Sequence, residues 1–302
     1  MNRMTIASVA LWCAVGAHLL LILSTTLFGL RLPAPGLPIV VLLVVTTIHA
    51  LRRYSLTTFL VFAVIAFVVS NGYENLSILT GFPFGNYYYT DVLGPKLFLV
   101  PVLIAPAYFA AGYFAWSIAH ILLGLFGPDP RGRDVVFVPV IASLVMVMWD
   151  MVMDPINATI GRTWVWEDGG SYFGVPVSNY LGWLLCVYTI FQLFAFYLAW
   201  RSRGATAQQD SQPVFGRSYW YQAIIPFFTI SLALILRVFA DGGRVVADPT
   251  GYAWSTTHIY ESMTLVAIFT MWFVCLLSAL LVARAQEVEP PQAIGLRPSS
   301  SG

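Results

Sequence analysis

The chain has 302 residues, of which 59% are hydrophobic and only 10% are charged, and its formal net charge is +1. Soluble domains carry about 25% charged residues, so this composition excludes a protein whose whole surface faces water. A disordered chain needs low hydrophobicity and a nucleic-acid binder needs a basic surface, and neither condition is met. The composition therefore predicts an integral membrane protein.

Eight apolar segments are candidates for membrane-spanning helices, because a spanning helix needs about 20 mostly apolar residues. In chain order they cover residues 5–30, 37–51, 55–71, 96–126, 134–153, 180–200, 219–240 and 258–283. The second and third segments are short, and seven crossings are the alternative count. Pro101 and Pro106 are expected to bend the long fourth segment, since proline removes a helical hydrogen-bond donor. We predict an all-α, polytopic bundle of about eight transmembrane helices with aromatic loops on its outer face.

The basic residues indicate how this bundle is oriented, because Lys and Arg are enriched in cytoplasmic loops. With the N-terminus inside, ten basic residues lie on the cytoplasmic side and four on the outer side, with Arg237 inside the seventh segment. Nine of the fourteen acidic residues fall at outward helix ends or outward loops. We predict a multi-pass protein of the cell membrane with both termini in the cytoplasm. Residues 1–285 are expected to form a single transmembrane catalytic domain, and residues 286–302, rich in Pro, Ser and Gly, a disordered tail.

The histidines and cysteines are isolated along the chain, so no pair has the spacing of a metal site or of a disulfide framework. Four isolated histidines also give little support to a haem held between two helices. We therefore expect neither a metal nor another cofactor.

The segment 71–95, NGYENLSILTGFPFGNYYYTDVLGP, combines glycines and prolines with many aromatic residues. Its composition argues against a continuous helix, and non-helical backbone at membrane depth must be buried in protein or line a cavity. One interpretation is a re-entrant or capping loop over a pocket. The alternative is an interfacial belt in which Tyr87, Tyr88 and Tyr89 lie at the level of the lipid headgroups.

The segment WDMVMDP, at residues 149–155, places Asp150 and Asp154 four residues apart, so both carboxyl groups project from one helical face. Two acids that repel each other in a low-dielectric site keep one of them protonated near neutral pH. Such an acid is able to protonate a carbon–carbon double bond. In the alternative interpretation, Asp154 ends the helix before Pro155 and Asp150 pairs with a cation such as Arg237.

The segment 161–183, GRTWVWEDGGSYFGVPVSNYLGW, is an outer loop that is rich in aromatic and polar residues. Aromatic faces stabilise cations and also stack on flat polyene chains. An interfacial belt is again the alternative. His258 and Glu261 lie three residues apart at the outward start of the eighth segment, where they either relay a proton or are simply hydrated.

Three stretches resemble the signature segments of the CruF-type carotenoid 1,2-hydratases: TGFPFGNYYYTDVLGP (80–95), DMVMDP (150–155) and WVWEDGGSYFGVPVSNYLGW (164–183). This integral membrane family includes the γ-carotene and bisanhydrobacterioruberin hydratases, and the resemblance runs across roughly residues 65–285. It implies carotenoid biosynthesis by cofactor-independent hydration of the terminal C1=C2 double bond of an acyclic end group, giving a tertiary 1-hydroxy group. The implied partners are water, a carotenoid of the γ-carotene, lycopene or bisanhydrobacterioruberin type, membrane lipid and neighbouring enzymes of the pathway, but no nucleic acid.

Hydration of this double bond needs an acid that protonates C2, groups that stabilise the cation at C1, and a base that orients the attacking water. We expect the acid to be Asp150 or Asp154 and the base to be Glu74 or Glu261. The residues expected to line the substrate site or to hold water are Tyr87, Trp149, Trp164, Trp166, Tyr172, Phe173, Asn71, Asn86 and Asn179.

Two other functions remain as alternatives at this point. A carotenoid end-group cyclase or isomerase would use the same protonation but quench the cation intramolecularly in a drier pocket. A small transporter or channel would place its acids along a path through the bilayer. The acids gather at one face instead, which favours an enzyme.

Overall fold

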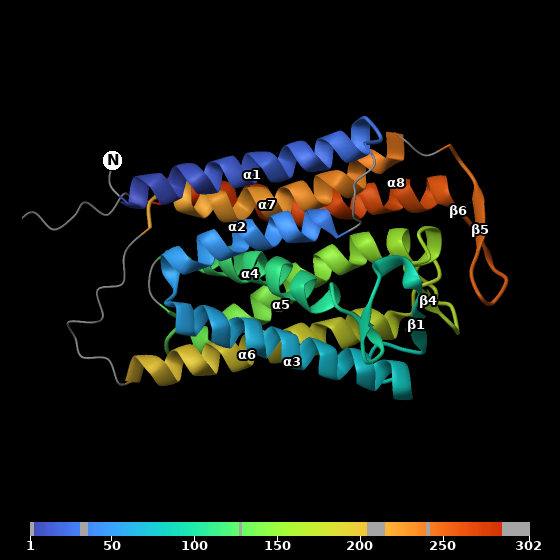
Figure 1. The fold of residues 1–302 in the computed structure, drawn as a ribbon, viewed down its shortest axis with the longest axis horizontal. Coiled ribbons are helices and arrows are strands. Elements are labelled where there is room, and N and C mark those ends of the chain that lie inside the picture. The colour runs from blue at the N-terminus through green and yellow to red at the C-terminus, as the bar shows by residue number, and fades with distance from the viewer. Residues whose placement is uncertain (1–2, 31–35, 127–128, 204–214, 240–241, 286–302) are drawn as a thin grey trace, which may run out of the picture.

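The computed structural model describes residues 3–30, 36–126, 129–203, 215–239 and 242–285, and its helices run side by side along one long axis (Figure 1). Eight helical rods make up this part of the chain. They are α1 (Arg3–Leu27), α2 (Leu37–Arg53), α3 (Leu56–Thr80), α4 (Ile104–Leu122), α5 (Asp134–Asp154), α6 (Val177–Arg203), α7 (Arg217–Leu236), and α8 (Thr256–Ala267) continued by α9 (Phe273–Arg284). The prediction of an all-α polytopic bundle is confirmed.

Short turns extend three of these rods. The π-helical turn η2 (Pro155–Ile160) continues α5, the 3-10 turn η3 (Arg237–Phe239) continues α7, and the π-helical turn η4 (Ile268–Trp272) joins α8 to α9. π-helical turns interrupt the regular hydrogen-bond ladder and are frequent at functional sites. The turn η2 directly follows Asp154.

Six segments of the described chain are long and apolar enough to cross a membrane. They are Ile6–Leu27, Leu56–Thr80, Asp134–Ile160, Val177–Arg203, Arg217–Phe239 and Thr256–Arg284. These six identify a membrane protein, as the composition predicts. The cell membrane as its location and the cytoplasmic placement of the termini stay predictions.

The helix α4 is the centre of the bundle. Every residue from Tyr108 to Ile121 is buried, and α4 contacts α2, α3, α5, α7 and α9. A helix that is apolar on all sides belongs inside a bundle, and its small residues let neighbouring helices approach closely. At Gly112, an added Cβ would lie 3.3 Å from Met146 Sδ on α5 and 3.5 Å from the Phe191 ring on α6.

The predicted bounds of the third helix are wrong, because α3 continues to Thr80 instead of ending near residue 71. Gly72 is accommodated inside the helix, and the helix ends where Gly81 adopts a left-handed conformation with φ +77° and donates its amide to Ser77 O. The first ten residues of the segment predicted to be non-helical are therefore helical. As a result, the carboxyl group of Glu74 is placed by a rigid helix.

The fourth segment also differs from its prediction, since its first residues form a small hairpin and α4 begins only at Ile104. In this hairpin β2 (Lys96–Leu97) pairs with β3 (Val100–Pro101). Pro106 then falls in the first turn of α4, where its missing amide hydrogen interrupts no helical bond. Neither proline bends a helix here.

The aromatic outer loops meet in a strand pair at one end of the bundle (Figure 1). β1 (Tyr87–Tyr89) runs antiparallel to β4 (Trp164–Trp166), with Tyr87 opposite Trp166 and Tyr89 opposite Trp164. Strand alternation turns Tyr87 and Tyr89 inward, with exposed fractions of 4% and 7%, and leaves Tyr88 at 47%. The loop therefore covers the bundle, as the pocket interpretation predicts, and only Tyr88 has the exposure expected of a belt residue.

Two further elements complete this end of the molecule. The 3-10 turn η1 (Asp91–Leu93) follows β1, and a hairpin of β5 (Val245–Ala247) and β6 (Ala253–Ser255) precedes α8. The predicted disordered tail at 286–302 lies outside the described residues. The division into one catalytic domain and a tail stays a prediction.

We expect a methyl group at Gly182 to destabilise the fold. A Cβ on this α6 residue would lie 2.7 Å from the Phe84 ring and 2.9 Å from the Pro83 carbonyl, whereas a Cβ at Gly72 meets nothing within 4 Å. Gly182→Ala should lower the free energy of unfolding by about 1–3 kcal/mol through overpacking, while Gly72→Ala should raise it by up to about 1 kcal/mol. Thermal unfolding midpoints in one detergent test this, and equal midpoints for the two variants would contradict it.

Candidate active site

A cavity of about 260 Å³ lies beneath the β1–β4 pair, bordered by α2, α3, α4, α5 and α6. Three carboxyl groups line it, from Glu74, Asp150 and Asp154. Aromatic rings supply most of the remaining wall, from Phe84, Tyr87, Tyr89, Tyr108, Trp149, Trp164, Trp166 and Trp183. A largely apolar cavity with a few convergent polar groups is the usual form of a small-molecule site.

Asp150 and Asp154 lie on one face of α5, as their spacing predicts. The Nδ2 atom of Asn179 on α6 donates to Asp150 Oδ2 at 3.0 Å and to Asp154 Oδ2 at 2.6 Å. The indole nitrogen of Trp164 donates to Asp154 Oδ1 at 2.5 Å. Asp150 Oδ1 is buried and has no hydrogen-bond partner within the described part of the chain.

The structural alternative for this aspartate pair holds only in part. Arg237 is exposed on η3, and in the described residues no salt bridge joins any cation to Asp150. The α-helix α5 does end at Asp154, before Pro155, but the rod continues through the π-helical turn η2.

Glu74 projects from α3 into a ring of three tyrosines. Tyr108 donates its hydroxyl to Glu74 Oε1 at 2.8 Å, Tyr89 donates to Oε2 at 2.9 Å, and Tyr87 also donates to Oε2. Burial and the adjoining Glu74 carboxyl group raise the pKa of Tyr87 and of Tyr89 well above the ordinary value of a tyrosine. Both hydroxyls therefore stay protonated and remain hydrogen-bond donors. An ionised carboxylate only accepts hydrogen bonds, and this ring supplies donors to both of its oxygens.

The aromatic wall is built from rings in mutual contact. Tyr108 stacks on Trp183 with a centroid separation of 4.4 Å, and Trp149 meets Trp183 edge-on at 6.0 Å. Across the strand pair, Tyr87 lies 4.8 Å from Trp166. No Lys, Arg or His from the described ranges lines the cavity, so its attraction for a cation comes from π-faces and carboxyl groups.

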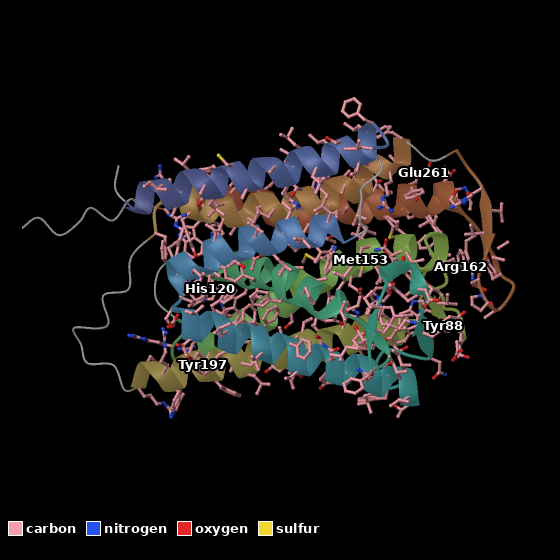
Figure 2. All side chains as sticks on the ribbon, viewed as in Figure 1. Tyr88, His120, Met153, Arg162, Tyr197 and Glu261 are labelled. Atoms are coloured by element: carbon pink, nitrogen blue, oxygen red, sulfur yellow. The ribbon has the colours of Figure 1, made fainter. Side chains whose placement is uncertain are left out.

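The structure brings together most of the residues predicted for the site. Those that line the cavity are Glu74, Tyr87, Trp149, Asp150, Asp154, Trp164, Trp166 and Asn179. Figure 2 shows Glu261 on the α8 side of the bundle, away from Tyr88 and the strand pair, and its side chain is exposed. Glu261 therefore lies apart from the other three predicted carboxyl groups.

Four other predicted residues also lie outside the cavity wall. Asn86 directly precedes β1, is exposed and donates to Asp168 Oδ2 at 2.7 Å. Asn71 donates back to Phe67 O within α3. Tyr172 contacts Met263 Sδ through its hydroxyl, and the Phe173 ring lies 5.6 Å from Trp254.

Several cavity residues were missed from the sequence, and only some had a detectable signal. Tyr89 is two residues from Tyr87 on a strand, and Trp183 is four residues from Asn179 on a helix, so periodicity places each on the face of a predicted residue. Met153 and Asn157 follow from the Asp150–Asp154 face in the same way. Tyr108 had no such signal, since only the packing of α3 against α4 brings it to Glu74.

The model of a family described as carotenoid biosynthesis protein matches residues 36–246, which is more than half of the chain. The chain belongs to this family. The matched range includes all three carboxyl residues of the cavity, and the family resemblance predicted from the sequence is confirmed.

One curated relative is the bisanhydrobacterioruberin hydratase of Haloarcula japonica. It is 33% identical to this chain over 128 residues, which is 42% of this chain and 41% of the relative. The match thus spans less than half the length of either protein. No solved structure matches the chain.

Asp248 is a buried aspartate outside the membrane-spanning segments, and it lies within the β5–β6 hairpin. Asp248 Oδ1 accepts hydrogen bonds from the Thr250 amide and hydroxyl and from the Tyr252 amide, and Oδ2 accepts one from the Trp254 indole at 2.9 Å. Burial alone would raise the pKa of Asp248, but these donors outweigh it and lower the pKa below its ordinary value.

This lowered pKa predicts a pH-dependent contribution of Asp248 to stability. The contribution is fully present above the unfolded-state pKa of about 3.9 and is lost as the pH falls through the lower folded-state value. Asp248→Asn should therefore lower the thermal midpoint at neutral pH, and its difference from the wild type should shrink in acid. Midpoints of both proteins measured in detergent between neutral and strongly acidic pH test this, and a difference that is independent of pH would contradict it.

Proposed function

We propose that the protein is a carotenoid 1,2-hydratase that adds water across the terminal C1=C2 double bond of an acyclic carotenoid end group. The observation that carries this proposal is the cavity itself, in which a pair of buried carboxyl groups and a tyrosine-bound carboxyl group face one aromatic space. Membership in a carotenoid biosynthesis family and similarity to a protein named as a hydratase support it.

Asp150 is the proton donor in this proposal. Both oxygens of Asp154 accept N–H donors, from Trp164 and from Asn179, which suits an ionised carboxylate. Asp150 keeps one oxygen without a partner, and that oxygen is the place for the single proton that two adjacent acids share. Asp150 gives this proton to C2, and the electron pair of the double bond forms the new C2–H bond.

The tertiary cation that forms at C1 is stabilised by the cavity wall. The π-faces of Trp149, Trp183 and Tyr108 surround the space in which the end group lies, and the Glu74 carboxylate supplies a fixed negative charge. Groups arranged in advance around a developing charge lower the barrier more effectively than mobile water.

Glu74 orients the water that captures this cation. A carboxylate offers about four lone-pair sites, and three tyrosine hydroxyls occupy three of them, so one site remains for a water. The water oxygen bonds to C1 and its proton passes to Glu74. Exchange through solvent then returns one proton to Asp150, so the net reaction adds one water molecule to the substrate. Glu261 takes no part, because it lies outside the cavity.

We further propose that the cavity lies toward the outer face of the cell membrane. Arg52 and Arg53 end α2, and Arg201 and Arg203 end α6, all at the bundle end opposite the β1–β4 pair. Basic residues favour the cytoplasmic side, so the strand end faces outward and both termini face inward.

The reaction predicts a defined product. Expression in a host that makes lycopene or γ-carotene should give a 1-hydroxy carotenoid whose mass exceeds that of its precursor by one water. The new oxygen should come from isotopically labelled water. An isomer of unchanged mass would support an end-group cyclase instead, and oxygen derived from O₂ would contradict the acid–base reaction.

The aspartate pair should be essential for turnover. Asp150→Asn and Asp154→Asn should each lower the rate of product formation by about 10²-fold or more, the usual contribution of general acid–base catalysis. Glu167→Gln is the control, because Glu167 is an exposed acid just after β4, outside the cavity wall, and its substitution should leave the rate unchanged. Near-normal turnover in both aspartate variants, at equal amounts in the membrane, would overturn the acid assignment.

Glu74 and Glu261 should differ sharply, although both lie toward the outer ends of helices. Glu74→Gln removes the acceptor site for water and the negative charge beside the cation, so we expect a loss of about 10²-fold or more. Glu261→Gln should keep the wild-type rate. Product yields from the two variants in the same host test this, and the reverse result would move the base to α8.

A further inference from the structure

The residues that line the cavity divide by exposure into a deep end and a mouth. The carboxyl groups of Glu74, Asp150 and Asp154 belong to the deep end, with exposed fractions of 3% or less. The lining residues that are partly exposed are Ile39, Leu93, Ile104, Ala107, Trp149 and Asn157. All of these except Asn157 are apolar, so the exposed part of the lining forms an apolar mouth, whereas the carboxyl groups are buried.

On its α2 and α4 side this mouth continues into exposed apolar surface. Ile39 belongs to the first turn of α2, Leu93 to η1, and Ile104 to the first turn of α4. Val40 beside Ile39 and Val102 just before α4 are exposed apolar side chains, at 48% and 46%, whereas the η1 edge carries the exposed Asp91. In a membrane-spanning bundle such exposed apolar surface faces acyl chains, so a molecule dissolved in the bilayer reaches the mouth without crossing water.

The cavity is too small for a whole carotenoid. A water needs roughly 10–15 Å³ of space for its centre, so 260 Å³ holds on the order of 20 water-sized groups. An acyclic carotenoid such as lycopene has about twice as many carbon atoms. A large part of the polyene must therefore stay outside the mouth, among the lipid chains, while its end group lies beside the carboxyl groups.

We propose that the carotenoid end group enters sideways from the bilayer through this mouth, and that the protein recognises only the half of the carotenoid that carries this end group. The proposal rests on the proposed function for the identity of the ligand. If it is correct, acyclic carotenoids that share one end but differ in the opposite half bind equally well. It also lets the two ends of a symmetric carotenoid react in separate binding events.

Narrowing the mouth tests the route. Ala107→Phe on α4 and Ile39→Phe on α2 place larger rings at the opening, and Val64→Phe on the lipid-facing side of α3 is the matched control, since Val64 is exposed and lies outside the cavity wall. The probe is lycopene with saturated terminal double bonds, which binds without reacting, and quenching of tryptophan fluorescence in detergent reports its binding. We expect each mouth variant to bind this probe about tenfold more weakly, equivalent to about 1.4 kcal/mol, and Val64→Phe to bind it as the wild type does.

The outcomes separate this proposal from the proposed function. Unchanged binding in both mouth variants, or no binding by the wild-type protein, would overturn the lateral route even if hydration is observed. Weakened binding in the mouth variants supports the route even if the labelled-water experiment fails, because the probe does not react. Thermal midpoints close to that of the wild type show that the variants are folded, and the two mouth substitutions, on different helices, check each other.

Competition tests the recognition of the end group alone. Carotenoids that share one acyclic end but differ in the other half should displace the saturated probe with affinities within about threefold of one another, whereas a carotenoid cyclised at both ends should not displace it. Affinities that change with the chemical structure of the opposite half of the carotenoid would show that recognition extends beyond the cavity.

Discussion

Burying three carboxyl groups among apolar helices is the constraint on which the rest of this structure depends. A carboxylate without donors is costly in a low-dielectric interior, so each group needs partners that the chain must deliver. These partners come from distant segments, with Tyr108 on α4, Asn179 on α6 and Trp164 on β4. The strand pair that covers the cavity therefore also donates hydrogen bonds to the carboxyl groups beneath it.

The choice of partners matters as much as their number. Every donor to these carboxyl groups is a neutral hydroxyl, amide or indole. At the opposite end of the bundle, Asp129 instead meets Arg201 at 3.0 Å, where the negative charge is neutralised. Neutral donors hold a carboxylate in place and leave its charge available to a transient cation, whereas an arginine would cancel that charge.

Features that depend on residue spacing along one helix or strand could be predicted from the sequence. The i, i+4 rule placed Asp150 and Asp154 on one face, and hydropathy located the rods. Contacts that depend on how separate elements pack against one another could not be predicted in this way. The sequence predicts Glu74 and Glu261 as alternative bases because both lie near outward helix ends, but α8 does not border the cavity, so Glu261 lies outside it. The length of α3 was likewise underestimated, because one glycine costs only about 1 kcal/mol in a helix and Gly72 does not end it.

The enclosed position of α4 has a consequence for its polar side chains. Two of its tyrosines meet partners on neighbouring helices, since Tyr108 donates to Glu74 on α3 and the Tyr113 hydroxyl lies 2.6 Å from His49 Nδ1 on α2. Hydrogen bonds thus join the central helix to its neighbours in addition to close packing. A change to α2 or α3 that removes one of these partners leaves a polar group of α4 buried without one.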